Sequence, residues 1–263
     1  MLGECHAHLF MNGYNYKEAV NNHKGHIRED LIREGLKAYQ DNHITFIRDG
    51  GDHLGVSVRA RELAPEYGID YRSPIFAIHK NGYYGGIVGH GFDTIEEYTD
   101  LVRQVKKEKG DFIKIMASGI LDFDAFGSVS TPLRDEKLIH EMVHIAHEEG
   151  FSVMVHVNTP TQIRYALEGG CDSVEHGYYM DDECRRIFKE TGAIWVPTIA
   201  TCGNLRRSDR FNKEAVEKIV ASHMDSVRKA LKTGITIATG SDAGAYLVPH
   251  GSGLLDEIDI LKE

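Results

Sequence analysis

The chain has 263 residues, of which 41% are hydrophobic and 27% are charged, a composition typical of soluble globular proteins. Acidic residues outnumber basic ones by 40 to 30, and the formal net charge of −10 argues against a nucleic-acid-binding protein, which needs clustered Lys and Arg. No apolar run reaches the roughly 20 residues of a membrane span. The four cysteines are far apart in the sequence, which predicts reduced thiols and a cytoplasmic location. The unusual feature is the 15 histidines, which direct attention to metal chemistry.

Short apolar runs alternate with longer amphipathic stretches along the chain. The runs predict strands at 3–7, 44–49, 71–78, 112–117, 151–157, 173–176, 193–197 and 235–241. The stretches between them predict helices, among them 28–40, 94–107, 135–149, 161–168, 181–190 and 213–232. Near-continuous apolar strands are typical of parallel sheets that are buried on both faces. Alternating strands and helices over this length predict an α/β protein with one domain, a (β/α)8 TIM barrel over residues 1–263.

Polar side chains stand at the ends of several predicted strands, where barrel enzymes carry their active sites. They are His6 and His8 on the first strand, Lys114 on the fourth, His156 on the fifth, His176 on the sixth and Asp242 on the eighth. Because His6 and His8 are two residues apart, both point to the same face of a strand and can bind one cation. A single histidine in a strand is usually a core residue with a hydrogen-bond partner. Six such groups at one barrel mouth instead predict a metal site.

This ordered set of residues resembles the signature of the amidohydrolase superfamily. The stretches 111–119 (DFIKIMASG), 175–177 (EHG) and 240–244 (GSDAG) are similar to its binuclear branch, near imidazolonepropionase-like and prolidase-like members. The resemblance covers essentially the whole chain and implies a TIM barrel. The small β-sandwich that usually accompanies the barrel is expected to be largely or wholly absent, because the chain begins within the first strand. Its absence would leave barrel surface uncovered, which favours a homo-oligomer.

The resemblance implies a site with two divalent metal ions, for which zinc is the first choice. His6 and His8 would hold the more buried ion, His156 and His176 the more exposed one, and Lys114, carboxylated by CO2, would bridge the two. Asp242 would contact the buried ion and act as the catalytic base and then acid. The expected reaction is metal-dependent hydrolysis of a carbon–nitrogen bond in an amide or cyclic amide, with a metal-bridging hydroxide attacking a small-molecule substrate.

Two other reactions stay open. Hydrolysis of a lactone, ester or phosphotriester would use the same binuclear site, because these substrates need the same hydroxide. A mononuclear deaminase of the superfamily is less consistent with the chain. Such enzymes typically lack the lysine on strand 4 and carry a glutamate shortly after the strand-5 histidine, where this sequence has Asn158, Thr159 and Pro160. The tyrosine that prolidase-like members tend to carry after that histidine is also missing.

A second histidine motif, HEMVH at 140–144, matches the HExxH pattern of zinc proteases, and His147 adds a third imidazole. At roughly 100° per residue, the three histidines fall within about 60° of each other on a helix. The apolar residues of the same helix lie on the opposite side. We therefore predict a solvent-facing histidine stripe rather than a protease site.

The loops at the strand ends are expected to contact the substrate. The glycine-rich stretch 82–91 (GYYGGIVGHG) supplies Tyr83, Tyr84 and His90, and His250 follows Asp242 closely enough to reach the same pocket. A further loop at 198–210 carries Arg206, Arg207 and Arg210. This group is interpreted as a solvated charge cluster, with binding of an anionic substrate as the alternative.

Overall fold

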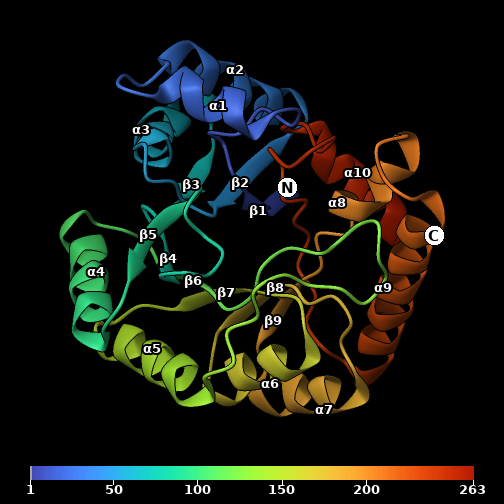
Figure 1. Ribbon diagram of the computed structural model, residues 1–263. Coiled ribbons are helices and arrows are strands. Elements are labelled where there is room, and N and C mark those ends of the chain that lie inside the picture. Colours follow the sequence, from blue (N-terminus) through green and yellow to red (C-terminus); the bar gives the residue numbers. More distant parts are fainter. Residues whose placement is uncertain (1) are drawn as a thin grey trace.

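Helices surround a set of parallel strands in the computed structural model, which describes residues 2–263 (Figure 1). The strands are β1 Leu2–Ala7, β2 Ile44–Asp49, β3 Asp70–Arg72, β4 Ala77–Lys80, β5 Gly89–Phe92, β6 Ile113–Met116, β7 Val153–Val157, β8 Ser173–His176 and β9 Ile194–Val196. The helices are α1 Tyr16–His23, α2 Glu29–Asp41, α3 Val56–Leu63, α4 Ile95–Lys107, α5 Glu136–Glu148, α6 Pro160–Glu168, α7 Asp182–Thr191, α8 Ala200–Gly203, α9 Lys213–Thr233 and α10 Ser252–Leu261, with 3-10 turns η1 Ala64–Tyr67 and η2 Asn204–Arg207. In the part of the chain that is described, no helix is both long and apolar enough to cross a membrane.

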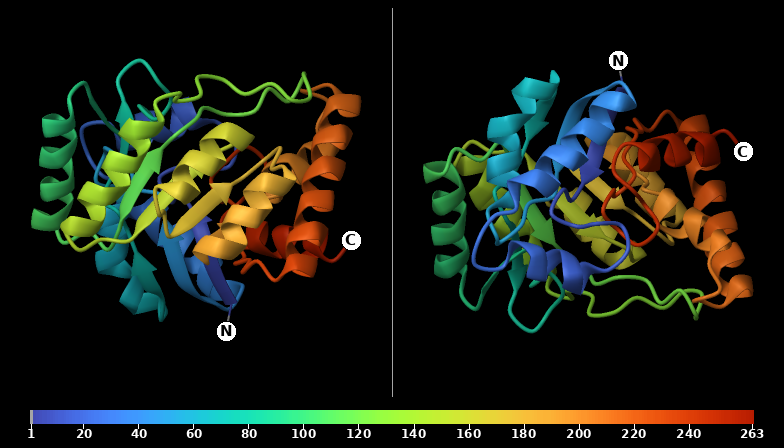
Figure 2. Two further views of the ribbon diagram at one scale, coloured as in Figure 1. Left: turned by 90° about the horizontal axis from the view of Figure 1, so that it is seen from below. Right: turned by 90° about the horizontal axis from the view of Figure 1, so that it is seen from above.

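The strands form two sheets in the orders β1-β2-β3 and β5-β4-β6-β7-β8-β9, and every strand pair is parallel. Between β9 and β1 lies the segment 235–243, which is bonded to both neighbours. Trp195 donates its backbone N–H to Thr236 at 2.9 Å, and the N–H of Asp242 donates to the carbonyl of His6 at 2.7 Å. The strands therefore curve around one centre with helices outside (Figure 1), and the views at right angles show helices in front of the strands (Figure 2). The predicted α/β fold with parallel strands is confirmed. Among residues 2–263, no sheet lies outside these two.

Three details of the predicted strands are wrong. The run 71–78 is split into β3 and β4, because Pro74 has no N–H to donate and Ile75 has a φ of 70°. The run 235–241 makes only isolated bridges, and the positive φ of 59° at Asp242 turns the chain out of the sheet just beyond it. Strand β5 lies inside the glycine-rich stretch expected to be a loop.

Alternation along each strand decides which side chains face the barrel interior. In β6, Ile113 and Ile115 belong to the hydrophobic cluster packed against α4 and α5, so Lys114 between them points inward. In β7, Val153, Val155 and Val157 do the same, which turns His156 inward. The same apolar residues that build the core therefore aim the polar residues at the centre of the barrel.

The close approach of β5 to β4 yields a first prediction. A Cβ on Gly89 would lie 1.7 Å from the carbonyl oxygen of Ala77, whereas a Cβ on Gly86 in the same stretch would meet nothing nearer than 3.9 Å. We expect Gly89→Ala to lower the free energy of unfolding by about 3 kcal/mol, the upper end for overpacking, because a backbone atom must move. Gly86→Ala is the control, with little change expected. Urea denaturation checks this, and equal midpoints for the two variants would contradict it.

Candidate metal centre

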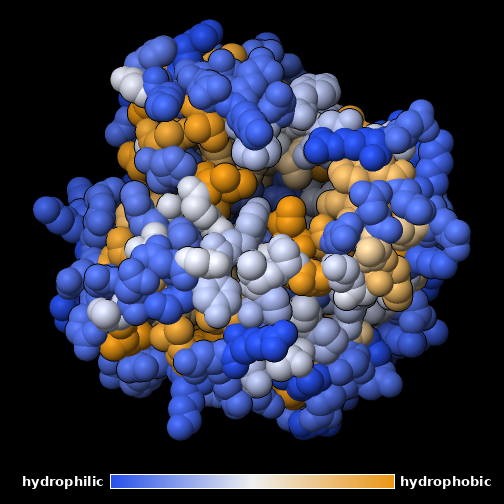
Figure 3. All heavy atoms as spheres, viewed as in Figure 1, coloured by the Kyte–Doolittle hydropathy of each residue, from blue (hydrophilic) through white to orange (hydrophobic). Residues whose placement is uncertain are grey.

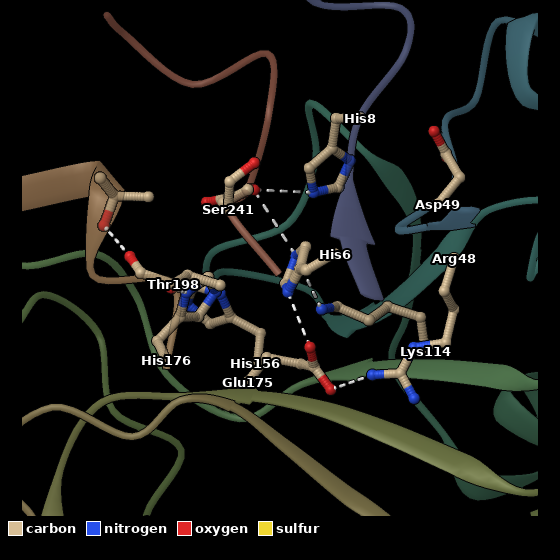
Figure 4. A network of polar contacts seen from close by, with 12 residues as sticks. His6, His8, Arg48, Asp49, Lys114, His156, Glu175, His176, Thr198 and Ser241 are labelled. Carbon is tan, nitrogen blue, oxygen red and sulfur yellow. Dashed lines mark hydrogen bonds and ion pairs between the residues drawn. The ribbon is translucent and has the colours of Figure 1, made fainter. Parts of the chain in front are cut away.

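The six predicted ligands come together at the carboxyl ends of the strands. Figure 4 labels five of them, and Asp242 lies within 3.6 Å of two of these five. His6 comes from β1 and His8 directly follows it, Lys114 comes from β6, His156 from β7, His176 from β8 and Asp242 from the segment between β9 and β1. The five nitrogen-bearing side chains are at least 94% buried. Residues separated by more than 230 positions in the sequence thus share one small volume.

The shortest distances join Asp242, Lys114 and the histidines of β1. Asp242 Oδ1 lies 3.6 Å from Nε2 of His6 and 3.6 Å from Nε2 of His8. Lys114 Nζ lies 3.4 Å from Nε2 of His6. The ring centroids of His6 and His176 are 4.9 Å apart, and those of His156 and His176 are 4.5 Å apart. His6, His8 and Asp242 each offer a ligand atom within 4.8 Å of the others, which suits a shared cation.

The Nδ1 atoms of His6 and His8 each contact an oxygen of the protein. His6 Nδ1 is 2.8 Å from Glu175 Oε2, and His8 Nδ1 is 3.4 Å from the carbonyl oxygen of Gly51. Since Glu175 and Gly51 offer only acceptor oxygens, they favour a proton on Nδ1. The lone pair of each ring is then on Nε2, the atom nearest Asp242.

His156 and His176 also contact a protein oxygen through one ring nitrogen each. His156 Nε2 is 3.0 Å from the carbonyl oxygen of Gly119. His176 Nδ1 is 2.7 Å from Thr198 Oγ1, whose own proton goes to the carbonyl of Pro197 at 2.8 Å. These acceptors place the ring protons on His156 Nε2 and His176 Nδ1, which leaves the lone pairs on His156 Nδ1 and His176 Nε2. Such oxygen partners behind metal-binding imidazoles fix the tautomer and the ring orientation.

Burial keeps the imidazoles neutral, as metal ligands must be. It lowers the pKa of His6 and His176 well below the usual value, and lowers the pKa of His8 and His156 to about 3, with the charge of Lys114 as the second cause in the latter two. Burial also lowers the pKa of Lys114 to about 8, although Glu175 and Asp242 act in the opposite direction. The pKa of Asp242 is raised by burial to about 7, with the Lys114 charge opposing the rise. A cation bound to this carboxylate would lower its pKa.

Sequence reasoning missed the residues that hold the ligands in place. Glu175 is fully buried and binds His6 with one carboxylate oxygen, while Arg48 and Ser173 bind the other. Arg48 also donates to the carbonyl of Cys5 at 3.0 Å, so it links β1 to β8. One signal for Glu175 was its place in the stretch 175–177 (EHG), directly before His176, whereas nothing in the sequence pointed to Arg48.

A cavity of about 990 Å³ opens onto this cluster, and hydrophobic side chains border the hollow in Figure 3. Lys114, His8, His156, His176 and Asp242 line it, together with Tyr84 and several apolar residues of the surrounding loops. Tyr84 packs its ring 5.3 Å from that of His156. Of the four predicted substrate contacts, Tyr84 is thus the one at the cavity wall.

The other three predicted substrate contacts lie elsewhere. Tyr83 is exposed, and His90 on β5 places its ring against Phe76 at 4.6 Å. His250 uses both ring nitrogens inside the protein, with Tyr39 Oη at 3.0 Å and the Met11 carbonyl at 2.8 Å. The cavity wall does not include these three residues: Tyr83 and His90 are exposed, and both ring nitrogens of His250 are bonded within the protein.

The HExxH stretch lies on α5, outside the barrel. His144 is 70% exposed and pairs with Glu148, and His147 binds Asp172 at 2.9 Å. His140 is half-buried, with Glu136 and Glu168 nearby. The predicted solvent-facing stripe is confirmed for His144 and His147, and none of the three lines the cavity.

The profile of the family described as "Amidohydrolase family" matches residues 4–262. The chain belongs to the amidohydrolase family. Among curated relatives of this amidohydrolase, an ochratoxinase from Aspergillus niger is 30% identical over 189 residues, which cover 70% of this chain and 38% of that protein. The chain therefore spans much less than the whole length of this relative.

Solved structures share the fold of this amidohydrolase. A Xaa-Pro dipeptidase with bound methionine in its active site has a TM-score of 0.78 and 23% identity, over 99% of this chain and 69% of that one. The A. niger ochratoxinase structure has a TM-score of 0.73 and 20% identity, over 98% of this chain and 69% of that one. At these identities the likeness concerns the fold, and the superfamily and barrel expected from the sequence are both confirmed.

Glu175 provides a test of the centre's construction. We expect Glu175→Gln to lower the affinity for Zn²⁺ by about 10-fold to 100-fold, because the neutral amide holds the His6 proton less firmly. Glu257→Gln is the matched control, since Glu257 is equally buried but binds the backbone of Ala200. Titration of both variants against a chelator measures the affinity, with circular dichroism to verify folding. Equal affinities in the two folded variants would show that Glu175 does not position His6 for a cation.

Proposed function

We propose that this amidohydrolase is a metal-dependent hydrolase of carbon–nitrogen bonds in amides or cyclic amides. The observation that carries the proposal is the set of four buried imidazoles, each bonded through one ring nitrogen to an oxygen of the protein, which gather with Asp242 and Lys114 at the carboxyl ends of the strands. Neutral imidazoles and carboxylates are the donors that Zn²⁺ prefers. The donor set therefore fits two divalent cations, with zinc as the first choice.

The ligands divide into two groups by position. His6 and His8 with Asp242 would hold one cation, and His156 with His176 would hold the other. When bound, such cations lower the pKa of a water molecule and polarise a substrate carbonyl. Asp242 lies within 3.6 Å of both β1 histidines, where it accepts the proton of the attacking water and returns it to the leaving nitrogen.

Lys114 is the bridging group in this proposal. Its ammonium form would repel cations held by the neighbouring imidazoles, because Nζ lies 3.4 Å from Nε2 of His6. Reaction of the neutral amine with CO2 forms a new N–C bond and releases one proton, which leaves a carbamate with one negative charge. This change converts a repulsive group into an anionic ligand at the same position.

A substrate panel tests the reaction class. We expect the zinc-loaded protein to hydrolyse members of a set of N-acyl amino acids, dipeptides and cyclic amides, and to lose this activity when a chelator removes the metal. Lactones and phosphotriesters belong in the same panel. Turnover of those alone would refute carbon–nitrogen hydrolysis and support ester or phosphotriester hydrolysis at the same site.

Replacement of Lys114 tests the metal count. Lys114→Ala should reduce bound zinc from two ions to one or none and abolish most activity, because the bridge is lost. Added small carboxylates should restore part of the activity. Lys80→Ala is the control, since Lys80 donates to the Asp93 carbonyl and does not line the cavity. Elemental analysis and rate measurements check both variants. A fully active Lys114→Ala protein that holds two ions would contradict the bridging role.

A further inference from the structure

The three arginines of the 198–210 loop differ in their partners. Arg206 pairs with Glu217 at 3.0 Å and Glu263 at 3.3 Å, and Arg207 lies 3.4 Å from Asp256. Arg210 has no acidic partner among residues 2–263, and it alone of the three lines the cavity that contains the candidate metal centre. The solvated charge cluster expected from the sequence therefore describes Arg206 and Arg207, but not Arg210.

Aromatic rings position the Arg210 guanidinium. Its Cζ lies 5.1 Å from the ring centroid of Phe211 and 4.9 Å from that of Tyr246, both of which also line the cavity. Cation–π contacts of this kind favour the charged group without using its N–H donors. The planar guanidinium thus keeps a fork of donors for a ligand, and this fork matches the two oxygens of a carboxylate.

The cavity wall next to Arg210 indicates which other groups a ligand would have. Phe123 packs 5.3 Å from Phe211, and Leu205 and Tyr178 extend the apolar lining. Lys17 adds a second positive charge to the cavity, while the carboxylate of Asp122 accepts the N–H of Asp124 at 2.9 Å. A cavity of about 990 Å³ is at the upper end of the range for small-molecule sites, so it accommodates a bulky apolar group in addition to the scissile amide.

We infer that the site takes amides that carry a carboxylate together with a bulky apolar or aromatic group, and that Arg210 binds this carboxylate. The inference rests on the proposed function for the reaction itself, but recognition of the carboxylate can be measured without turnover. Arg210 is a specificity-determining residue in this account, because a neutral analogue of the same shape would lose the charged hydrogen bonds.

A binding experiment tests recognition directly. Dansyl-L-leucine and dansyl-L-leucinamide differ only in the carboxylate. Their sulfonamide bond has no carbonyl for the centre to attack, and mass spectrometry after each titration verifies that the carboxamide is intact. By fluorescence anisotropy, the zinc-loaded wild-type protein should bind dansyl-leucine about ten-fold more tightly than the carboxamide. Arg210→Met should weaken binding of dansyl-leucine about ten-fold and change that of the carboxamide less than two-fold. Arg207→Met, the matched control outside the cavity, should leave both dissociation constants unchanged.

The outcomes separate the two proposals. Equal binding of the two probes by wild-type protein, or an equal loss for both in Arg210→Met, would overturn the inference whatever the activity. If the charge preference holds but no N-acyl amino acid is hydrolysed, the inference stands and the proposed reaction fails. If both proposals are correct, Arg210→Met raises KM for N-(2-naphthoyl)-L-leucine about ten-fold, with little effect on its carboxamide. If Arg210→Met does not fold, Arg210→Gln removes the charge with a smaller loss of polarity and provides the same comparison of the two probes.

Discussion

The constraint on which the rest of the structure depends is the burial of four imidazoles close together at one end of the strands. Glu175, Gly51, Gly119 and Thr198 each bind one nitrogen of one histidine and so fix the orientation of its ring. Burial keeps all four rings neutral, which is the state in which an imidazole binds a metal ion. A divalent cation is a ligand that several such rings can share.

The fold brings the predicted metal ligands together at one end of the strands. Alternation along β6 and β7 sends Ile113, Ile115 and the valines of β7 into the helical layer, and the same alternation turns Lys114 and His156 inward. The ligands are therefore positioned by the hydrophobic core rather than by flexible loops. Loops instead build the outer cavity, where Arg210 and its aromatic neighbours lie. This division separates a rigid centre for chemistry from a variable wall for recognition.

The sequence predicted the centre better than its surroundings. His6 and His8 had a spacing that fixes a common face, and the six residues lie within or directly after predicted strands, so the strand pattern together with the resemblance to the amidohydrolase superfamily pointed to them. Glu175 and Arg48 carry no such pattern, because their partners come from strands far away in sequence. Strand β5 was not predicted, because its first residue is a glycine. Glycine is needed there since the backbone of Gly89 lies close to Ala77 of β4, and such a tertiary contact cannot be deduced from local sequence. Whether Tyr83 and His90 reach the cavity depends on the path of the loop between β4 and β5, which the local sequence does not determine.

A single diffraction experiment can decide whether this centre binds two metal ions. In crystals of the zinc-loaded protein, anomalous scattering at the zinc edge locates every bound ion without assumptions about the ligands. The account predicts two peaks inside the cavity, one beside His6, His8 and Asp242 and one beside His156 and His176, with density for a carboxylated Lys114 between them. Peaks confined to surface histidines such as His144, with none at the strand ends, would contradict it.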